Sequence, residues 1–168
     1  MSKYPHEDTK DFVDAIQYTA GEMGFFEALI EKDYFCSLIL REVYSGDHHG
    51  LIFKGGTLLN KTHAGFYRLS EDLDFSINVE NSTTRNERRK IASPIKTLFK
   101  KIASSLSLEH PNDLKGQNES MQYNGVILYD SLTLGEKGTI KIEIGIREPV
   151  FEETTLQAKT LVKDPFSE

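Results

Sequence analysis

The sequence is poor in cysteine, lacks tryptophan and contains no long apolar run. Because Cys36 is the only cysteine, the chain cannot form an internal disulfide or a cysteine-rich zinc cluster, which fits a reducing cytoplasm. No apolar run approaches the roughly 20 residues that a transmembrane helix needs. The polar N-terminus, Met1–Asp8, has no signal-peptide core. We therefore expect a cytoplasmic protein that does not insert into a membrane.

Positive charge is also scarce, with 20 Lys and Arg against 26 Asp and Glu, a formal net charge of −6. Proteins that hold duplex nucleic acid over a broad surface are usually basic, so this class is disfavoured, although a local basic patch is compatible with the composition. The 38% apolar and 27% charged content is typical of a folded domain. We expect a single domain over residues 1–168, with N-terminal helices in 1–46 and a catalytic core in 47–168.

Hydrophobic periodicity predicts a mixed α/β (α+β) fold. Helical spacing covers residues 12–20 and 26–43, and the apolar run Leu51–Phe53 predicts a buried strand followed by a short helix over 57–64. Strict alternation predicts strands over 72–79 and 140–147. The order of these elements predicts a mixed sheet with helices packed on it.

Weaker signals complete this pattern. Thr84 and Glu87 match a capping box that begins a helix ending near Leu106, in which Pro94 predicts a kink or a restart. Residues 107–120 are polar and predict a loop. Residues 123–134 predict a further strand, and 156–162 predict a weaker last one.

Three carboxylates are the main candidates for chemistry. Asp72 and Asp74 leave the same face of a strand, and two oxygen donors on one rigid face suit Mg²⁺ or Mn²⁺. Glu143 lies on a strand whose other face is all isoleucine. If the two strands pair, the three acids share one face and can hold metal ions that activate an attacking oxygen and stabilise a leaving pyrophosphate. The alternatives are chance surface acids and a surface pair of Glu143 with Lys141 or Arg147.

The turn Gly55-Gly56-Thr57 joins a strand to a helix. Glycines let the backbone approach a phosphate, and the first N–H groups of the helix point toward it. The Gly-x-x-x-x-Gly-Lys spacing of a P-loop is absent. Gly-Gly is also frequent in ordinary tight turns, so the motif gains meaning only in combination with the acids.

Fourteen residues separate Thr57 from Asp72. A strand, Gly-Gly-Thr, a short helix and a strand carrying Asp-x-Asp resemble the polymerase-β-type nucleotidyltransferase motif. The longer segments Phe53–Lys61 and Arg68–Phe75 resemble the AbiEii/AbiGii abortive-infection toxin family. Glu31-Lys32-Asp33-Tyr34 is similar to the leading helix of that family, and Ile140–Ile144 is similar to its later acidic strand.

The resemblance implies a role for each motif residue. Gly55, Gly56 and Thr57 would hold a nucleoside triphosphate, Asp72 and Asp74 would bind Mg²⁺ or Mn²⁺, and Glu143 would complete the catalytic acids. The implied nucleotide-binding positions also include three further side chains: Lys61, Arg68 and Ser70. Lys61 and Arg68 would neutralise phosphate charge, with surface solubility as the alternative.

The resemblance also implies a nucleotidyltransferase that modifies RNA, with the acceptor end of tRNA as the favoured substrate, acting as the toxin of a toxin–antitoxin pair with an antitoxin as partner. Family members continue into a helical segment with a further Lys and an Arg-Asp-rich motif, whereas this chain stops at Glu168, so we expect that segment to be absent. Transfer to a protein or small molecule, and an inactive binding module, are the competing hypotheses.

Overall fold

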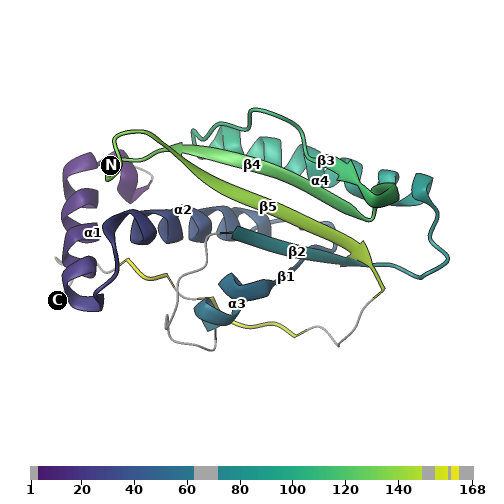
Figure 1. Cartoon of the computed structure of the whole chain (residues 1–168), viewed down its shortest axis with the longest axis horizontal. Helices are drawn as coiled ribbons and strands as arrows, with labels where there is room; N and C mark the ends of the chain where they lie inside the picture. Colours follow the sequence, from purple (N-terminus) through teal and green to yellow (C-terminus); the bar gives the residue numbers. More distant parts are fainter. Residues whose placement is uncertain (1–3, 63–71, 149–153, 159, 163–168) are drawn as a thin grey trace.

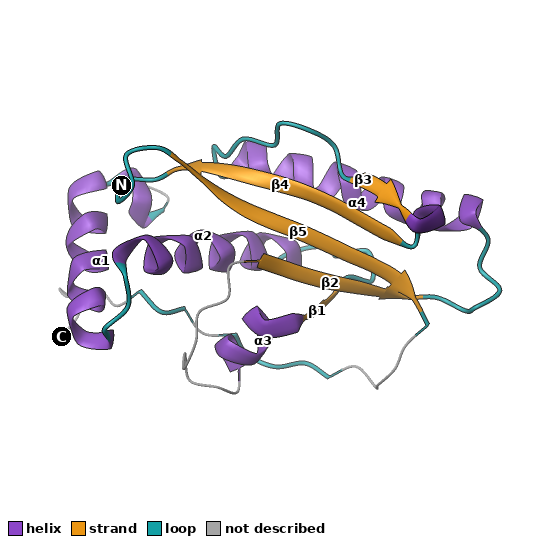
Figure 2. Cartoon of the chain, in the orientation of Figure 1, coloured by secondary structure: helices purple, strands orange, loops and turns teal. Residues whose placement is uncertain are grey.

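The computed structural model describes residues 4–62, 72–148, 154–158 and 160–162. Its centre is a five-stranded mixed sheet with the strand order β1-β2-β5-β4-β3. The strands are β1 (Ile52–Lys54), β2 (Asp72–Asn78), β3 (Lys115–Gln117), β4 (Gln122–Asp130) and β5 (Lys137–Arg147). The predicted mixed α/β architecture is confirmed (Figure 2).

Four α-helices accompany the described sheet: α1 (Thr9–Met23), α2 (Glu27–Tyr44), α3 (Gly55–Thr62) and α4 (Arg85–Ser105). Helices α2 and α4 lie behind the sheet in Figure 1, α1 packs against α2, and α3 follows β1 directly. Two short 3-10 helices, Pro5–Glu7 and Asn118–Ser120, complete the described elements. No helix in the described part of the chain is long and apolar enough to cross a membrane.

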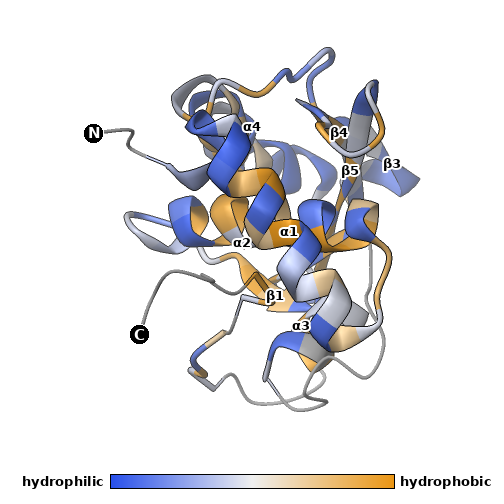
Figure 3. Cartoon of the chain, turned by 90° about the vertical axis from the view of Figure 1, so that its left-hand side faces the viewer, coloured by the Kyte–Doolittle hydropathy of each residue, from blue (hydrophilic) through white to orange (hydrophobic). Residues whose placement is uncertain are grey.

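Alternating burial orients the sheet. The four isoleucines of β5 are each at most 1% exposed and face the helices. On β2, Phe75 contacts the ring of Phe99 from α4 at 5.8 Å between centroids, and on β4 Tyr129 stacks on Phe35 of α2 at 4.4 Å. Hydrophobic residues accordingly gather around α2 in the centre of the molecule (Figure 3). Burying this face leaves the polar residues of β2 and β5 on the other one.

The capping box at the start of α4 is confirmed. Thr84 accepts a hydrogen bond from the backbone N–H of Glu87, whose carboxylate accepts one from the backbone N–H of Thr84. The expected restart at Pro94 is wrong, because α4 continues through it as one helix. Ile95 and Phe99 are buried just after Pro94, and this packing holds the helix together across the missing backbone donor.

Two other expectations are corrected. Residues 107–120 contain β3 and a 3-10 helix, which alternation could not reveal because β3 is an exposed edge strand without apolar residues. The weak strand expected over 156–162 is absent from residues 154–158 and 160–162. There Leu156 is exposed and only Leu161 is fully buried, so the apparent alternation does not correspond to a sheet face.

A buried carboxylate attaches α2 to the turn between β4 and β5. Glu31 is fully buried and accepts hydrogen bonds from the hydroxyl groups of Ser131 and Thr133 at 2.6 Å, and from the backbone N–H of Leu132 at 2.8 Å. Buried charge persists only when it is hydrogen-bonded in this way. This network fixes the start of β5, the strand that carries Glu143.

Candidate active site

The sheet register brings the predicted acids to one face. Strands β2 and β5 run parallel, with Asp74 directly opposite Glu143 and Asp72 opposite Lys141. Both acids of β2 and Glu143 are half-buried, while Leu73 between the two aspartates is fully buried on the other face. The expectation that the three carboxylates share one face is confirmed. Among the described residues, Glu143 forms no ion pair with Lys141 or Arg147.

The acids do not form a preassembled three-ligand cluster. Within the described segments, no three His, Cys, Asp or Glu side chains lie close enough together to hold one metal ion. Mg²⁺ retains several waters and binds substrate phosphates, so one or two carboxylates of the protein are enough for each ion. Asp72 and Asp74 on β2, with Glu143 beside them, therefore fit Mg²⁺ or Mn²⁺ by their chemistry.

Burial raises the pKa of Asp74 above its ordinary value. The charge of Lys54 opposes this shift, and the negative charges of Glu143 and Asp72 reinforce it. A carboxylate whose ionised form is disfavoured in the folded state, and which is flanked by other acids, is a site at which a cation is favoured.

The raised pKa has a consequence for stability without metal. The folded state holds the Asp74 proton more tightly than the unfolded chain, so its contribution to stability is lost as the pH rises from the ordinary aspartate pKa through the raised one. We expect Asp74→Asn to be more stable than wild type at neutral pH, with the difference shrinking as the pH falls below that window. Urea unfolding in EDTA measures it. Asp14→Asn, at an exposed position on α1, is the control, and a less stable Asp74→Asn protein at pH 7 would contradict the expectation.

Gly55 is in direct contact with the acids. Its φ is +80°, in the left-handed region that favours glycine, and a Cβ built on it would lie 2.2 Å from Oδ2 of Asp74. The first glycine of the Gly-Gly-Thr motif thus makes room for the Asp74 carboxylate. The turn and the Asp-x-Asp motif form one structural unit although they are separate in sequence.

Gly55→Ala should therefore damage the site more than the fold core. The added methyl group must displace the Asp74 carboxylate and is strained at positive φ, so we expect loss of nucleotide transfer together with about 1–2 kcal/mol of stability. Nucleotide-transfer assays and urea unfolding measure the two effects. Gly46→Ala is the matched control, because a Cβ at Gly46 meets nothing within 4 Å and its φ lies outside the left-handed region. Equal behaviour of the two variants would argue against the contact.

Thr57 connects α3 to β2. Its side chain is 1% exposed, and its hydroxyl donates to the backbone carbonyl of Asp72 at 2.6 Å. This bond fixes the start of the strand that carries the aspartates. Contact of Gly55, Gly56 and Thr57 with a triphosphate stays a prediction.

Lys61 occupies a different environment from the one expected of a surface lysine. It is 1% exposed, and its Nζ donates to Oδ1 of Asp33 at 2.6 Å and to the hydroxyl of Ser37 at 2.7 Å. The alternative that Lys61 serves surface solubility is wrong. Its charge is paired with that of Asp33, so the structure offers no support for its predicted phosphate contact. Arg68 and Ser70 lie outside the described residues.

Two cations lie near the acids, Lys54 and Arg147, of which only Arg147 was considered from the sequence, as a surface partner of Glu143. Lys54 is paired with Asp74 across the antiparallel β1–β2 ladder, so the row across three strands reads Lys54, Asp74, Glu143. Arg147 lies over Gly145, where a Cβ would come within 2.7 Å of its Nη2 atom. It is on the same face of β5 as Glu143, because residues two and four apart on a strand share a face. The four-residue separation of Glu143 and Arg147 was the feature of the sequence that could have placed Arg147 beside the acids.

Comparison with known proteins assigns the fold and the family. The model of the nucleotidyl transferase AbiEii toxin family, of type IV toxin–antitoxin systems, matches residues 38–168. The chain belongs to this family. The resemblance found in the Gly-Gly-Thr and Asp-x-Asp segments is thereby confirmed. A comparison with curated protein sequences finds no match.

Two solved structures from Helicobacter pylori resemble this AbiEii-family chain. JHP933 aligns with a TM-score of 0.50 and 18% identity over 73% of this chain and 45% of its own length. A protein described as a candidate nucleotidyltransferase aligns with a TM-score of 0.48 and 18% identity over 72% of this chain and 46% of its own length. At such identity the likeness to JHP933 concerns the fold. The chain spans less than half the length of either relative.

Proposed function

We propose that this AbiEii-family chain transfers a nucleotide from a nucleoside triphosphate to RNA, with the acceptor end of tRNA as the favoured substrate, as the toxin of a toxin–antitoxin pair. The observation that carries the proposal is the pairing of Asp74 with Glu143 across two parallel strands, with Asp74 packed against the Gly55 turn. Acids of this kind beside a phosphate-binding turn are what transfer from a triphosphate requires.

Each residue group then has a defined task. The backbone at Gly55 and Gly56 and the first turn of α3 would hold the triphosphate, while Asp72 and Asp74 would hold Mg²⁺ or Mn²⁺. The bound metal would lower the pKa of the attacking hydroxyl and neutralise the pyrophosphate that leaves. The RNA hydroxyl oxygen bonds to the α-phosphorus, the bond from that phosphorus to the bridging oxygen breaks so that pyrophosphate leaves, and Glu143 accepts the hydroxyl proton.

Substrate identity is tested by incubating the protein with Mg²⁺, each labelled nucleoside triphosphate in turn, and either purified tRNA, a synthetic protein mixture or small alcohols. We expect label on tRNA for at least one nucleotide. Label on protein or on a small molecule would show that this molecule, and not RNA, is the acceptor. Triphosphate binding without transfer to any acceptor would favour an inactive binding module.

The metal can be tested without turnover. Mg²⁺ or Mn²⁺ would bind the acids of the folded protein and not the unfolded chain, so either ion should raise the melting temperature. At an ion concentration of 100 times its Kd, the free energy of unfolding should increase by about 2.7 kcal/mol. Asp74→Asn should abolish the rise, whereas Asp14→Asn on α1 should retain it. Differential scanning calorimetry measures both, and an equal rise in wild type and Asp74→Asn would place the ion elsewhere.

A further inference from the structure

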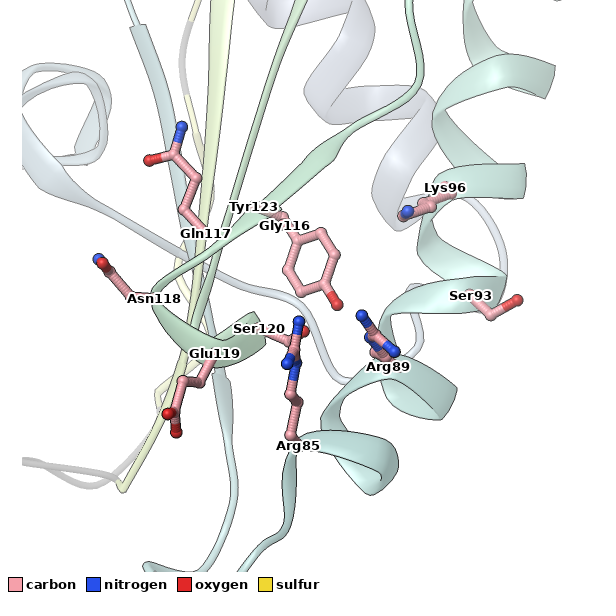
Figure 4. Close-up of a pocket in the computed structure, with 10 residues that line it drawn as sticks. All are labelled: Arg85, Arg89, Ser93, Lys96, Gly116, Gln117, Asn118, Glu119, Ser120 and Tyr123. Carbon is pink, nitrogen blue, oxygen red and sulfur yellow. The ribbon is translucent and has the colours of Figure 1, made fainter.

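A second site lies on the helix-covered side of the sheet. A cavity of about 490 Å³, open to solvent on one side, lies between the first half of α4 and the turn from β3 to β4 (Figure 4). Helix α4 contributes Arg85, Arg89, Ser93 and Lys96. Their spacing of four, four and three residues places them in one stripe along the helix. The cavity therefore has one wall made almost entirely of cationic side chains.

The positive charge of this wall is concentrated, and the nearest compensation comes from Asp113, which is ion-paired with Lys100 of the same helix and also interacts electrostatically with Lys96. Helix α4 has seven Lys and Arg residues and one Glu, a net +6, in a chain whose formal net charge is −6. Within the described part of the chain, no carboxylate lies within 4 Å of Arg85, Arg89 or Lys96. Figure 4 shows the carboxylate of Glu119, the acid that lines the cavity, pointing away from them. Such a cavity favours an anionic ligand.

Tyr123 forms the floor of the cavity, and packing fixes its position. Tyr123 is 3% exposed, Lys96 Nζ lies 5.3 Å from the centre of its ring, and its hydroxyl points toward Arg89 (Figure 4). Gly116, its cross-strand partner, leaves the room that the ring occupies, since a Cβ there would lie 3.0 Å from the ring. The buried ring offers a hydroxyl donor to the cavity instead of an aromatic face for base stacking.

Arg88, next to the cavity arginines in sequence, has a structural role that Arg85 and Arg89 do not share. Arg88 donates from Nε and Nη2 to the backbone carbonyl of Glu119 at 3.2 and 3.0 Å. That carbonyl lies in a turn whose residues Asn118, Glu119 and Ser120 all have positive φ, a strained backbone that needs external support. Arg88 holds the turn, while Arg85 and Arg89, on the adjacent stripe, face the cavity.

The cavity and the acids lie on opposite faces of the sheet, near the edge formed by β3. Strand β3 is the edge, and the register aligns Lys115 of β3 with Asn124 of β4, then with Glu143 and Asp74. Lys115 and Asp74 are three strand spacings apart, about 14 Å. Asn124 and Tyr123 are consecutive on β4 and therefore lie on opposite faces. Asn124 is on the face of the acids, and Tyr123 is on the face of the cavity.

We propose that this cavity binds consecutive phosphate groups of the acceptor RNA strand, which passes round the β3 edge to reach the acids. The inference rests on the proposed RNA acceptor. The cationic stripe from Arg85 to Lys96 covers eleven helical rises, about 16 Å along the helix axis. That length exceeds one compact triphosphate and fits a polyanionic strand. The protein thus combines a negative overall charge with local, phosphate-directed binding of a single strand.

The test measures RNA binding without turnover. Fluorescence anisotropy follows a short fluorescein-labelled single-stranded RNA with wild type, Arg85→Ala/Arg89→Ala and Lys90→Ala/Lys101→Ala, the last losing two charges from α4 outside the cavity. We expect the cavity variant to bind about ten- to a hundredfold more weakly, with a salt slope shallower by about 1.4 for two lost phosphate contacts. The control variant should weaken binding at most a few-fold.

The outcomes separate this inference from the proposed function. Arginine-dependent RNA binding by a protein that transfers no nucleotide would leave the inference standing and reject the activity. Nucleotide transfer to RNA that Arg85→Ala/Arg89→Ala leaves unchanged, with unchanged RNA affinity, would overturn the inference and keep the activity. Equal weakening by both double variants would show unspecific electrostatics and would also overturn it. If a free nucleoside triphosphate competes for the cavity better than RNA does, the ligand of the cavity is a nucleotide, and the inference of an RNA strand is overturned.

Discussion

Asp74→Ala and Asp72→Ala should each lower the rate of nucleotide transfer by about 10²- to 10³-fold or more. The reason is that transfer from a triphosphate leaves the protein little covalent work, so positioning and charge neutralisation supply nearly all of the acceleration. Both aspartates lie on the polar face of β2, away from the buried face that holds the helices. Single-turnover assays with labelled triphosphate and the identified acceptor measure the loss.

The fold should survive these substitutions, and this separates them from variants that merely unfold. Far-ultraviolet circular dichroism and the urea midpoint should stay at or above the wild-type values. Asp14→Ala on α1 controls for loss of an exposed aspartate. In bacteria, toxicity should disappear together with transfer. Full transfer or full toxicity of the Asp74→Ala protein would reject the nucleotidyltransferase assignment of this site and favour a binding module.

Lys61→Met should destabilise the protein by about 3–5 kcal/mol, the usual cost of leaving one partner of a buried ion pair uncompensated. Asp33 is 5% exposed, and besides Lys61 it accepts a hydrogen bond from the backbone N–H of Leu161 at 3.3 Å. The pair therefore connects α2, α3 and the segment around Leu161. The midpoint of urea unfolding, with an unchanged slope, measures the loss.

The matched control is the double variant Lys61→Met/Asp33→Asn. It removes both charges and keeps an oxygen acceptor for the Leu161 N–H, so it should lose clearly less stability than Lys61→Met alone. Such coupling would show that Lys61 acts through Asp33. A Lys61→Met protein of wild-type stability with weakened triphosphate binding would instead restore the predicted phosphate contact.

Local signals in the sequence were enough for much of the fold and for the acid face. Isoleucine at every second position of β5 fixes which face is buried, since a slip of one residue would bury Lys141 and Glu143, and the same alternation orients Asp72 and Asp74. The capping box fixes the start of α4 through bonds between residues three apart. These features depend on near neighbours in the chain, so local pattern alone is enough to predict them.

Contacts between distant segments could not be predicted from local pattern and are visible only in the folded chain. The parallel register sets Asp74 opposite Glu143, and the Asp74 carboxylate occupies the space that a side chain at Gly55 would need. Both follow from how strands separated by many residues pair. The burial of Lys61 follows from Asp33, which lies 28 residues earlier in α2. The cavity beside α4 depends on a strand, β3, that has no apolar residue. Periodicity reports which face of an element is buried; which elements meet is set by the packing of the whole chain.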